Sequence, residues 1–274
     1  HDDLGDALGM MDFETAAKMS GARFVVLSGK LARLDRALAA FMLDLQTKEN
    51  GYTECVPPYL VKAPALMGTG QLPKFEEDLF KTTGEHYLIP TAEIPITNIY
   101  RDVILSEKEL PIKHVGYTPC FRREAGSWGA NVRGLNRLHQ FDKVEIVRIE
   151  HPDNSYKVLE QMREHVEGLL QKLELPYRVL RLCGGDIGFT AALCYDLEVF
   201  SAAQKRWLEV SSISNFETFQ ANRLKLRFKD SDNNKHLAHT LNGSALALPR
   251  ILAAILENNQ EEGGKITIPK VLQP

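Results

Sequence analysis

Long apolar segments are missing from this chain of 274 residues. No run approaches the ~20 apolar residues with which a helix crosses a bilayer, so no membrane-spanning segment is predicted. The opening HDDLGDALGMMD has neither the basic flank nor the apolar core of a signal peptide. The chain begins with His1 rather than Met, which indicates a fragment, and the expected compartment of the protein is the cytoplasm.

Cysteine is scarce, and no Cys-x-x-Cys pair is present among Cys55, Cys120, Cys183 and Cys194. This spacing predicts reduced thiols in a cytosolic protein. A zinc site that uses Cys183 and Cys194 stays an open alternative, although no paired ligand motif supports it. Excess positive charge is missing too, since the formal net charge is -3. Any contact with nucleic acid must therefore be local or made by another segment.

Motifs of several enzyme classes are also absent, namely a Ser-His-Asp spacing, HExxH and a P-loop. The segment GGDIGF at 184–189 resembles a phosphate loop only superficially, because it lacks the Lys-Ser/Thr pair, and it is predicted to be a turn. What is present is an ordinary globular composition and enough length for one large domain with a substantial core.

The order of predicted elements indicates an α+β fold. Several strands are separated by turns rather than by helices, which favours a mainly antiparallel sheet flanked by helices. Leucines at helical spacing mark the clearest helix, 30–49, and further helices are predicted at 12–19, 153–173 and 249–258. Strands are predicted at 23–27, 52–56, 87–89, 177–182, 195–200, 206–212 and 235–241, and an ordered loop or connector at 68–80.

The stretch 120–145 concentrates positive charge around a glycine-rich bend at Gly126, Gly129 and Gly134. A strand is predicted on each side of the bend. Alternation along the second strand puts polar and aromatic side chains on one face, namely Arg137, His139, Phe141, Lys143 and Glu145. Its other face carries Leu138, Val144 and Ile146, which suit a core. The charged face could hold a flat anionic ligand, and a solvated hairpin with weak ion pairs is the alternative.

Other charged residues lack an explanation in the core as well. Three arginines suit a polyphosphate, because guanidinium binds phosphate oxygens bidentately. Glu209 and the nearby hydroxyl of Ser212 suit Mg²⁺, which prefers oxygen ligands. A cation at Arg250, in the first turn of a predicted helix, opposes the helix dipole and indicates an anionic partner. Thr91 and Glu93 form either a helix cap or a site for an ammonium group. The set predicts nucleotide chemistry by positioning and charge neutralisation.

Several of these segments resemble the class II aminoacyl-tRNA synthetases. FRRE at 121–124, the loop to Arg137, and HQFDKVE at 139–145 resemble motif 2 of that family. Motif 3 resembles the segment from NGS at 242–244 through Arg250 to LEN at 256–258. Motif 1 resembles the segment 51–58. TAE at 91–93, EVSS at 209–212, GTGQLPKFEEDLF at 68–80 and SNFETFQANR at 214–223 narrow the resemblance to the bacterial-type seryl-tRNA synthetases.

The resemblance covers essentially the whole chain as one catalytic domain, 1–274. It places motif 1 at about 30–58, motif 2 at about 112–149 and motif 3 at about 240–260. It implies a homodimer formed through motif 1 and a two-step reaction. L-serine and ATP, with Mg²⁺, would give seryl-adenylate and pyrophosphate, and the seryl group would then pass to tRNA(Ser).

The resemblance also implies residue roles. Arg122 would hold the α-phosphate and the serine carboxylate, Glu124 would meet the adenine amino group, and Phe141 would stack on the ring. Catalytic roles fall to Arg122, Arg250 and Glu209, and Glu209 and Ser212 would ligate Mg²⁺. The implied serine site is Thr91, Ala92, Glu93, Arg122, Glu145, Asn242 and Ser244. The implied ATP site is Arg122, Arg123, Glu124, Arg137, Leu138, Phe141, Glu209, Val210, Ser211, Ser212 and Arg250.

The chain departs from the family pattern at a few points. It starts just after the position of the N-terminal helical arm that grips tRNA, which puts tRNA charging by this fragment in doubt. Arg123 replaces a commoner Ser, and Pro249 stands where Gly is commoner. Two alternatives follow: an armless, zinc-dependent homologue that loads amino acids onto carrier proteins, and a non-catalytic paralogue. The intact Thr91-Ala92-Glu93 argues against the first, and the presence of Arg122, Arg250 and Glu209 against the second.

Overall fold

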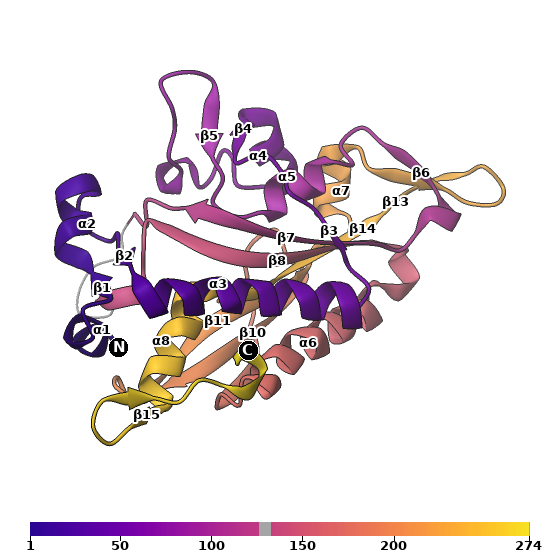
Figure 1. Ribbon diagram of the computed structural model, residues 1–274. Helices are drawn as coiled ribbons and strands as arrows, with labels where there is room; N and C mark the ends of the chain where they lie inside the picture. The colour runs from indigo at the N-terminus through magenta and orange to yellow at the C-terminus, as the bar shows by residue number, and fades with distance from the viewer. Residues whose placement is uncertain (126–132, 274) are drawn as a thin grey trace.

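The computed structural model describes residues 1–125 and 133–273, and a seven-stranded sheet forms its centre (Figure 1). The strands follow the order β3-β7-β8-β14-β11-β10-β9, and all neighbours in this sheet are antiparallel except β3 and β7. The predicted α+β class with a mainly antiparallel sheet is therefore confirmed. The strands are β3 (Thr53–Glu54), β7 (Ile112–Phe121), β8 (Gln140–Glu150), β9 (Tyr177–Arg181), β10 (Leu193–Ser201), β11 (Arg206–Asn215) and β14 (His239–Ala247).

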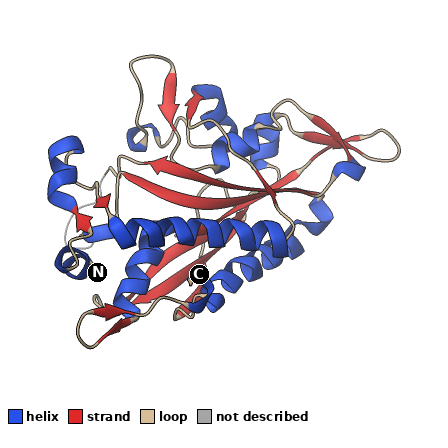
Figure 2. Cartoon of the chain, in the orientation of Figure 1, coloured by secondary structure: helices blue, strands red, loops and turns tan. Residues whose placement is uncertain are grey.

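Three helices cover one face of this sheet and share its main core (Figure 2). They are α3 (Gly29–Asp44), α6 (Ser155–Lys172) and α8 (Leu248–Asn258). The predicted helix 30–49 is confirmed, and its last part, Leu45–Glu49, is a π-helical turn. The leucines that predicted it, among them Leu31, Leu34 and Leu38, are buried in the core. No helix within 1–125 and 133–273 is long and apolar enough to cross a membrane.

Shorter helices lie against the other face. They are α4 (Ala63–Thr69), α5 (Glu93–Asn98) and α7 (Phe219–Leu224). Ile96 of α5 packs with Ala92 against Val147 of β8, on the side of the sheet away from Val144 and Ile146. Small sheets extend this layer: β4 (Leu60–Lys62) pairs with β5 (His86–Leu88), and β12 (Arg227–Lys229) pairs with β13 (Lys235–Leu237) and β6 (Ile104–Ser106).

The first and the last segments of the chain both contact α8 (Figure 1). The N-terminal part contains α1 (Asp2–Ala7), β1 (Met11–Asp12), α2 (Phe13–Ser20) and β2 (Val26–Leu27), and the C-terminal part contains β15 (Gln260–Glu261) and β16 (Lys265–Ile266). The predicted helix 12–19 is confirmed as α2, because the Asp12 side chain accepts a hydrogen bond of 2.8 Å from the amide of Thr15 and so caps it.

The ordered loop or connector predicted at 68–80 is confirmed for most of its length, since only Gly68 and Thr69 belong to α4 and Glu76–Asp78 forms a 3₁₀ turn. The predicted strand 235–241 was wrong as a single element, because it is divided between β13 and β14, which belong to different sheets. Its extended conformation was predicted correctly, but the sheet that each half joins depends on packing that the local pattern does not encode.

A partly buried histidine joins α6 to the segment that follows α3. The ring of His165 lies 3.1 Å from the hydroxyl of Tyr52, and the amide of Gln46 donates a long hydrogen bond of 3.5 Å to its backbone oxygen. Burial, assisted by the charges of Lys113 and Arg148, lowers the pKa of His165 from 6.5 to about 4. The folded protein therefore holds this imidazole neutral.

We expect the stability of the protein to fall as the pH drops from about 6.5 towards 4. In this range the unfolded chain binds a proton at His165 and the folded chain does not, so protonation favours unfolding. His165→Gln keeps a polar side chain beside Tyr52 but does not titrate. Its free energy of unfolding in urea should fall less between these two pH values than that of the wild type. Equal losses would contradict the assignment.

Candidate active site

A cavity of about 480 Å³ opens against the face of the sheet that does not carry the main core. Alternation along β8 explains the two faces, since Val144 and Ile146 enter the core while Phe141, Lys143 and Glu145 line the cavity. The prediction that Phe141 and Glu145 share one face is confirmed. Other predicted site residues that line the same cavity are Thr91, Glu93, Arg122, Glu124, Arg137, Leu138, Glu209, Val210, Ser212, Asn242, Ser244 and Arg250.

One end of the cavity is an acidic recess. Lys143 donates a 3.0 Å hydrogen bond to the hydroxyl of Thr91 and forms an ion pair of 2.7 Å with Glu145. The amide of Gln220, from α7, donates a 2.7 Å hydrogen bond to the carboxylate of Glu93. With two carboxylates and one ammonium group, the fully ionised recess carries an excess negative charge. Such a recess suits a small ligand with a cationic group.

The pKa of Glu93 is raised from 4.5 to about 7, first by burial and then by the nearby charge of Glu145. Hydrogen bonds from Gln220 and Asn242 and the charge of Lys143 act in the opposite direction. A cationic ligand would stabilise the ionised form of Glu93, because an opposite charge close to a carboxylate favours ionisation. The recess therefore favours a ligand that carries a cationic group.

The middle of the cavity presents an aromatic ring and arginines. The guanidinium of Arg122 lies over the ring of Phe141 at 5.2 Å from its centroid, and its Nε donates a 3.1 Å hydrogen bond to the backbone oxygen of Pro90. Arg137 forms a 2.6 Å ion pair with Glu124. The two side chains come from opposite ends of the bend, so the pair closes this part of the site.

Arg250 enters the cavity from the first turn of α8. Its Nε donates a 3.1 Å hydrogen bond to the backbone oxygen of Asn136, and its terminal nitrogen donates to the backbone oxygen of Glu209. Burial lowers the pKa of Arg250, although the charge of Glu209 partly offsets this. A partly buried cation at the positive end of a helix is unfavourable unless an anion compensates it, which fits the anionic partner expected from the sequence.

A β-bulge brings the acidic and hydroxyl groups of β11 to one face. The pairing of β10 with β11 shifts between Leu197 and Glu198, so Val210 is an extra residue in β11. Without the shift, Glu209 and Ser212 would point to opposite faces of the strand. With it, both line the cavity. Asp196, opposite Ser212 in the register, lines it too.

The pKa of Asp196 is raised to about 6, first by burial and then by the charge of Glu209. Two carboxylates and a serine hydroxyl thus face the same space, and the repulsion between the carboxylates would be relieved by a divalent cation. Oxygen donors of this kind are the ligands that Mg²⁺ prefers. The donor set fits the magnesium site expected at Glu209 and Ser212.

Three residues expected in the site lie outside the cavity lining. Ala92 is fully buried in the small core with Ile96. Arg123 is exposed, and its amide donates a 2.9 Å hydrogen bond to the backbone oxygen of Asp78. Ser211 is buried and donates a 2.5 Å hydrogen bond to the backbone oxygen of Ser244. Alternation explains the placement of Ser211, because its neighbour Ser212 on β11 faces the cavity, whereas Ala92 and Arg123 lie outside strands.

The start of β8 was also predicted too early. The strand begins at Gln140, after a 3₁₀ turn at Gly134–Asn136, so His139 precedes it. The His139 ring packs beside Phe24 and Phe80 instead of facing the cavity. Gly126 and Gly129 of the predicted bend lie outside the described residues.

Sequence reasoning gave no site role to Lys143, Gln220 or Asp196. Lys143 was on the correct face of its predicted strand, and Asp196 shared a face with Glu198, so a signal existed for both. Gln220 offered none, because only the packing of α7 against the sheet brings its amide to Glu93. Its amide oxygen accepts a 2.7 Å hydrogen bond from Thr240, which fixes the orientation of the group.

The two cysteines considered for zinc have different hydrogen-bond partners. Cys183 donates a 3.3 Å hydrogen bond to Asp186, and Cys194 lies 3.1 Å from the hydroxyl of Ser212. Among residues 1–125 and 133–273, no group of three or more His, Cys, Asp and Glu side chains is arranged to hold a metal ion.

The family model of the tRNA synthetase class II core domain (G, H, P, S and T) matches residues 74–259 of the chain. The chain belongs to this class II synthetase family. The matched region contains Arg122, which follows β7, and the cavity residues from β8, β10, β11, β14 and α8. This class II core was thus identified correctly from the three motif-like segments of the sequence.

Curated relatives of this class II chain include serine–tRNA ligases of several bacteria. It is 60% identical over 278 residues to that of Dechloromonas aromatica and 56% identical over 286 residues to that of an Acidovorax species. Both alignments cover 100% of the chain but 65% and 64% of the relatives. The chain therefore spans about two thirds of the length of these relatives, or slightly less.

Solved structures of class II synthetases are also similar to the chain in sequence and in fold. The chain is 44% identical to seryl-tRNA synthetase from Pyrococcus horikoshii complexed with ATP, with a TM-score of 0.94 and coverage of 98% of the chain and 61% of that protein. It is 33% identical to the cytoplasmic serine–tRNA ligase of Naegleria fowleri in complex with AMP, with a TM-score of 0.94 and coverage of 100% and 65%. A prolyl-tRNA synthetase of Giardia lamblia, 17% identical with a TM-score of 0.84, shares the fold.

We expect Glu93→Gln to make the protein more stable than the wild type at about pH 8. The folded-state pKa of Glu93, about 7, lies above its ordinary 4.5, so the stability that this shift contributes is present at low pH and lost as the pH rises through 7. Gln keeps an acceptor for the amide of Gln220. Urea unfolding should show the advantage at pH 8 and a smaller one at pH 5. A variant that is less stable than the wild type at both pH values would contradict the shift.

Proposed function

We propose that this chain is the catalytic part of a serine–tRNA ligase that activates L-serine with ATP. One observation carries the proposal: an acidic recess and an arginine-lined half share one cavity. The recess around Glu93, Glu145 and Thr91 would bind the ammonium and hydroxyl groups of serine. The arginines would bind phosphates and leave the serine carboxylate directed towards the α-phosphate.

The roles of the cationic residues follow from their positions. Arg122, between the recess and Phe141, would bind both the α-phosphate and the serine carboxylate and so stabilise charge that develops at phosphorus. Phe141 would stack on adenine and Glu124 would accept from its amino group. Arg137 and Arg250 would bind the outer phosphates or the adenine face. The ATP complex of the related Pyrococcus protein supports a nucleotide site in this fold.

Magnesium would be held by Glu209 and Ser212, with Asp196 close enough to add a carboxylate. When bound, the ion would neutralise charge on the phosphates of ATP. The chain's own contribution is to fix the donors: the bulge at Val210 turns Glu209 towards Ser212, and Arg250 holds the backbone oxygen of Glu209.

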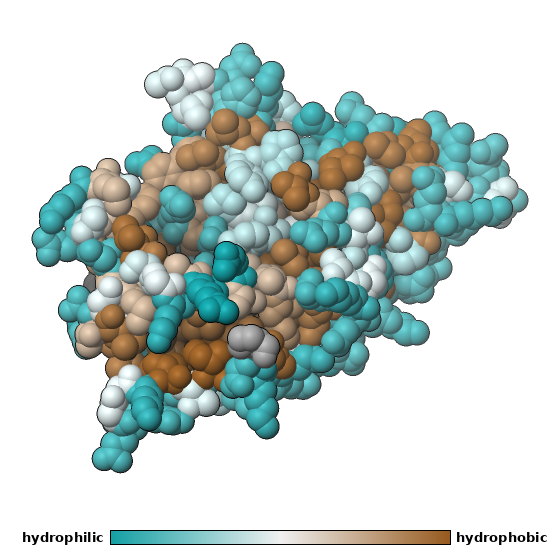
Figure 3. Space-filling view, in the orientation of Figure 1, coloured by the Kyte–Doolittle hydropathy of each residue, from teal (hydrophilic) through white to brown (hydrophobic). Residues whose placement is uncertain are grey.

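The wider activity of the intact protein is part of the same proposal. It would transfer the seryl group to tRNA(Ser), work in the cytoplasm, and form a homodimer through motif 1 at about 30–58. The space-filling view shows brown apolar residues among teal polar ones on the face where α3 lies, and Val56 beyond β3 is 82% exposed (Figure 3). The comparisons favour neither a carrier-protein ligase nor a non-catalytic paralogue, since the relatives that match the whole chain are serine–tRNA ligases.

The central test is serine-dependent exchange of pyrophosphate into ATP. We expect the wild type to catalyse exchange with serine and much less with alanine, because the recess would be left with an unsatisfied hydroxyl partner. Arg122→Ala should lower the rate by about 10²–10³, the usual cost of removing one donor to developing charge. Lys18→Ala, which removes an exposed cation paired with Glu14 on α2, serves as the control. Folded wild-type protein without any exchange would overturn the proposal.

A second test concerns the dimer. We expect Val56→Glu to shift the protein from dimer to monomer, because it would bury a carboxylate in the proposed interface. Met19 on α2 is also an exposed apolar residue, and Met19→Glu should leave the mass of the particle unchanged. Light scattering after size-exclusion chromatography measures both. A wild type that is monomeric at micromolar concentration would contradict the dimer.

A further inference from the structure

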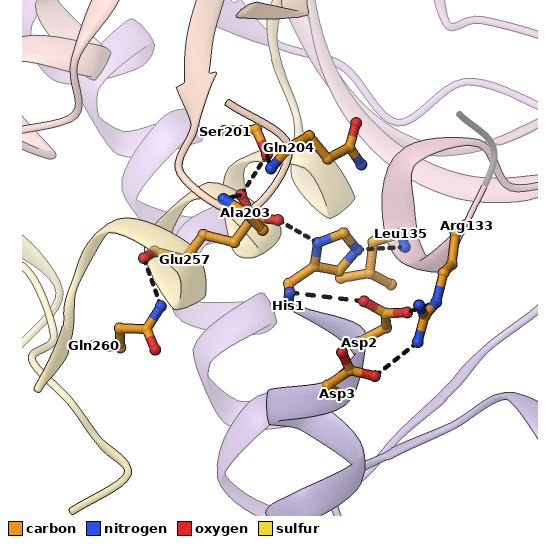
Figure 4. A network of polar contacts seen from close by, with 10 residues as sticks. All are labelled: His1, Asp2, Asp3, Arg133, Leu135, Ser201, Ala203, Gln204, Glu257 and Gln260. Carbon is orange, nitrogen blue, oxygen red and sulfur yellow. Dashed lines mark hydrogen bonds and ion pairs between the residues drawn. The ribbon is translucent and has the colours of Figure 1, made fainter. Parts of the chain in front are cut away.

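His1, the first residue of the chain, is buried, and its ring is hydrogen-bonded to two elements of the site (Figure 4). Nε2 of His1 accepts a 2.9 Å hydrogen bond from the amide of Leu135. A backbone amide can only donate, so the ring proton is on Nδ1, which lies 2.6 Å from the carboxylate of Glu257 and donates to it. His1 thereby links the 3₁₀ turn Gly134–Asn136 to α8.

The carboxylate of Glu257 is held from its other side as well (Figure 4). Its second oxygen accepts a 2.5 Å hydrogen bond from the hydroxyl of Ser201 and a longer one of 3.4 Å from the amide of Ala203. Ser201 is the last residue of β10. The turn after β10 therefore fixes the acceptor to which His1 binds, and Glu257 is only 4% exposed.

The contact between His1 and the turn is close. Gly134 has a φ of +68°, which favours glycine, and a Cβ at this position would collide with Nε2 of His1. The turn and the ring thus fit together only with glycine at 134. Leu135, whose amide binds the ring, is buried in the main core. Leu135 therefore anchors the turn to the core, and the hydrogen bond to His1 adds a connection that fixes how the turn lies against α8.

The same two elements hold Arg250. Arg250 lies on α8 about two turns before Glu257, and its Nε donates to the backbone oxygen of Asn136 at 3.1 Å. The turn and the helix are therefore joined twice, once by Arg250 at the cavity and once by His1 away from it. Asn136 also lines the cavity directly, next to Arg137.

We propose that His1 is a positioning residue for ATP binding, which keeps Arg250 in place by fixing the turn to α8. This inference rests on the proposed function. Without His1, the amide of Leu135 and the carboxylate of Glu257 would each lose a buried partner, and such groups draw in water or move to find another. The turn would then separate from α8, and the backbone oxygen that orients Arg250 would move with it. The acidic recess, on other elements, would be unaffected.

Surface contacts of the same N-terminal segment provide a matched control. Arg133 pairs with Asp2 and, at 2.7 Å, with Asp3, but its side chain is 67% exposed. Pairs of this kind contribute little to stability. Arg133→Ala therefore removes contacts of the segment next to His1 and leaves the buried connection intact.

The test compares variants of the intact protein. We expect His1→Phe, which keeps a ring but no nitrogen, to raise the Kd for ATP by about tenfold or more, the loss typical of one charge-assisted hydrogen bond. Its Kd for serine should change less than twofold. His1→Gln should restore part of the ATP affinity, because its amide offers one acceptor and one donor. Arg133→Ala should match the wild type. Calorimetry with ATP and serine separately measures these values without turnover.

Equal losses of ATP and serine affinity in folded His1→Phe, or none, would overturn the proposal and leave His1 as an anchor of the N-terminal segment only. If His1→Phe does not fold, His1→Gln gives the answer, since a milder version of the same ATP-specific loss is expected. Wild-type protein that binds ATP but shows no serine-dependent exchange would contradict the proposed function while the affinity comparison for ATP still tests His1.

Discussion

A buried ion pair on a strand that is apolar on its other side governs this site. Lys143 and Glu145 lie on β8 with a separation of 2.7 Å, and both are almost completely buried. Removing charges from water is costly unless each is paired and hydrogen-bonded. Lys143 meets this requirement through the carboxylate of Glu145 and the hydroxyl of Thr91. Val144 and Ile146, on the opposite face of the same strand, pack into the main core and hold the strand that carries the pair.

The remainder of the cavity distributes charge by the same rule. Arg250 is partly buried at the start of α8, where the helix dipole opposes a cation, and backbone oxygens of Asn136 and Glu209 compensate it only in part. Asp196 and Glu209 face the same cavity, and burial together with the charge of Glu209 raises the pKa of Asp196. Cationic and anionic groups are thus each left with an unmet electrostatic demand, and a phosphate with its metal ion would meet both. The site is preorganised for its ligands at a cost to the unliganded protein.

The N-terminal segment belongs to this arrangement although it lies outside the cavity. His1, Glu257 and Ser201 form a buried network that joins the first residue of the chain, α8 and the end of β10. Residues that contact no ligand can therefore determine the geometry of those that do. In a fold whose cavity is assembled from strands and helices far apart in the sequence, such connections between elements are required.

The sequence by itself determined the class of the fold and the main helices, and all but three of the site residues that it predicted line the cavity. Alternation was sufficient for β8, because a strand between a core and a polar site must place Phe141 and Glu145 together. The family resemblance supplied Glu209 and Arg250 from distant segments. Only the tertiary structure decided that a bulge at Val210 turns Glu209 towards Ser212, that Ala92 and Ser211 face away, and that Gln220 reaches Glu93. These depend on strand register and on the packing of separate elements, and neither is encoded in local periodicity.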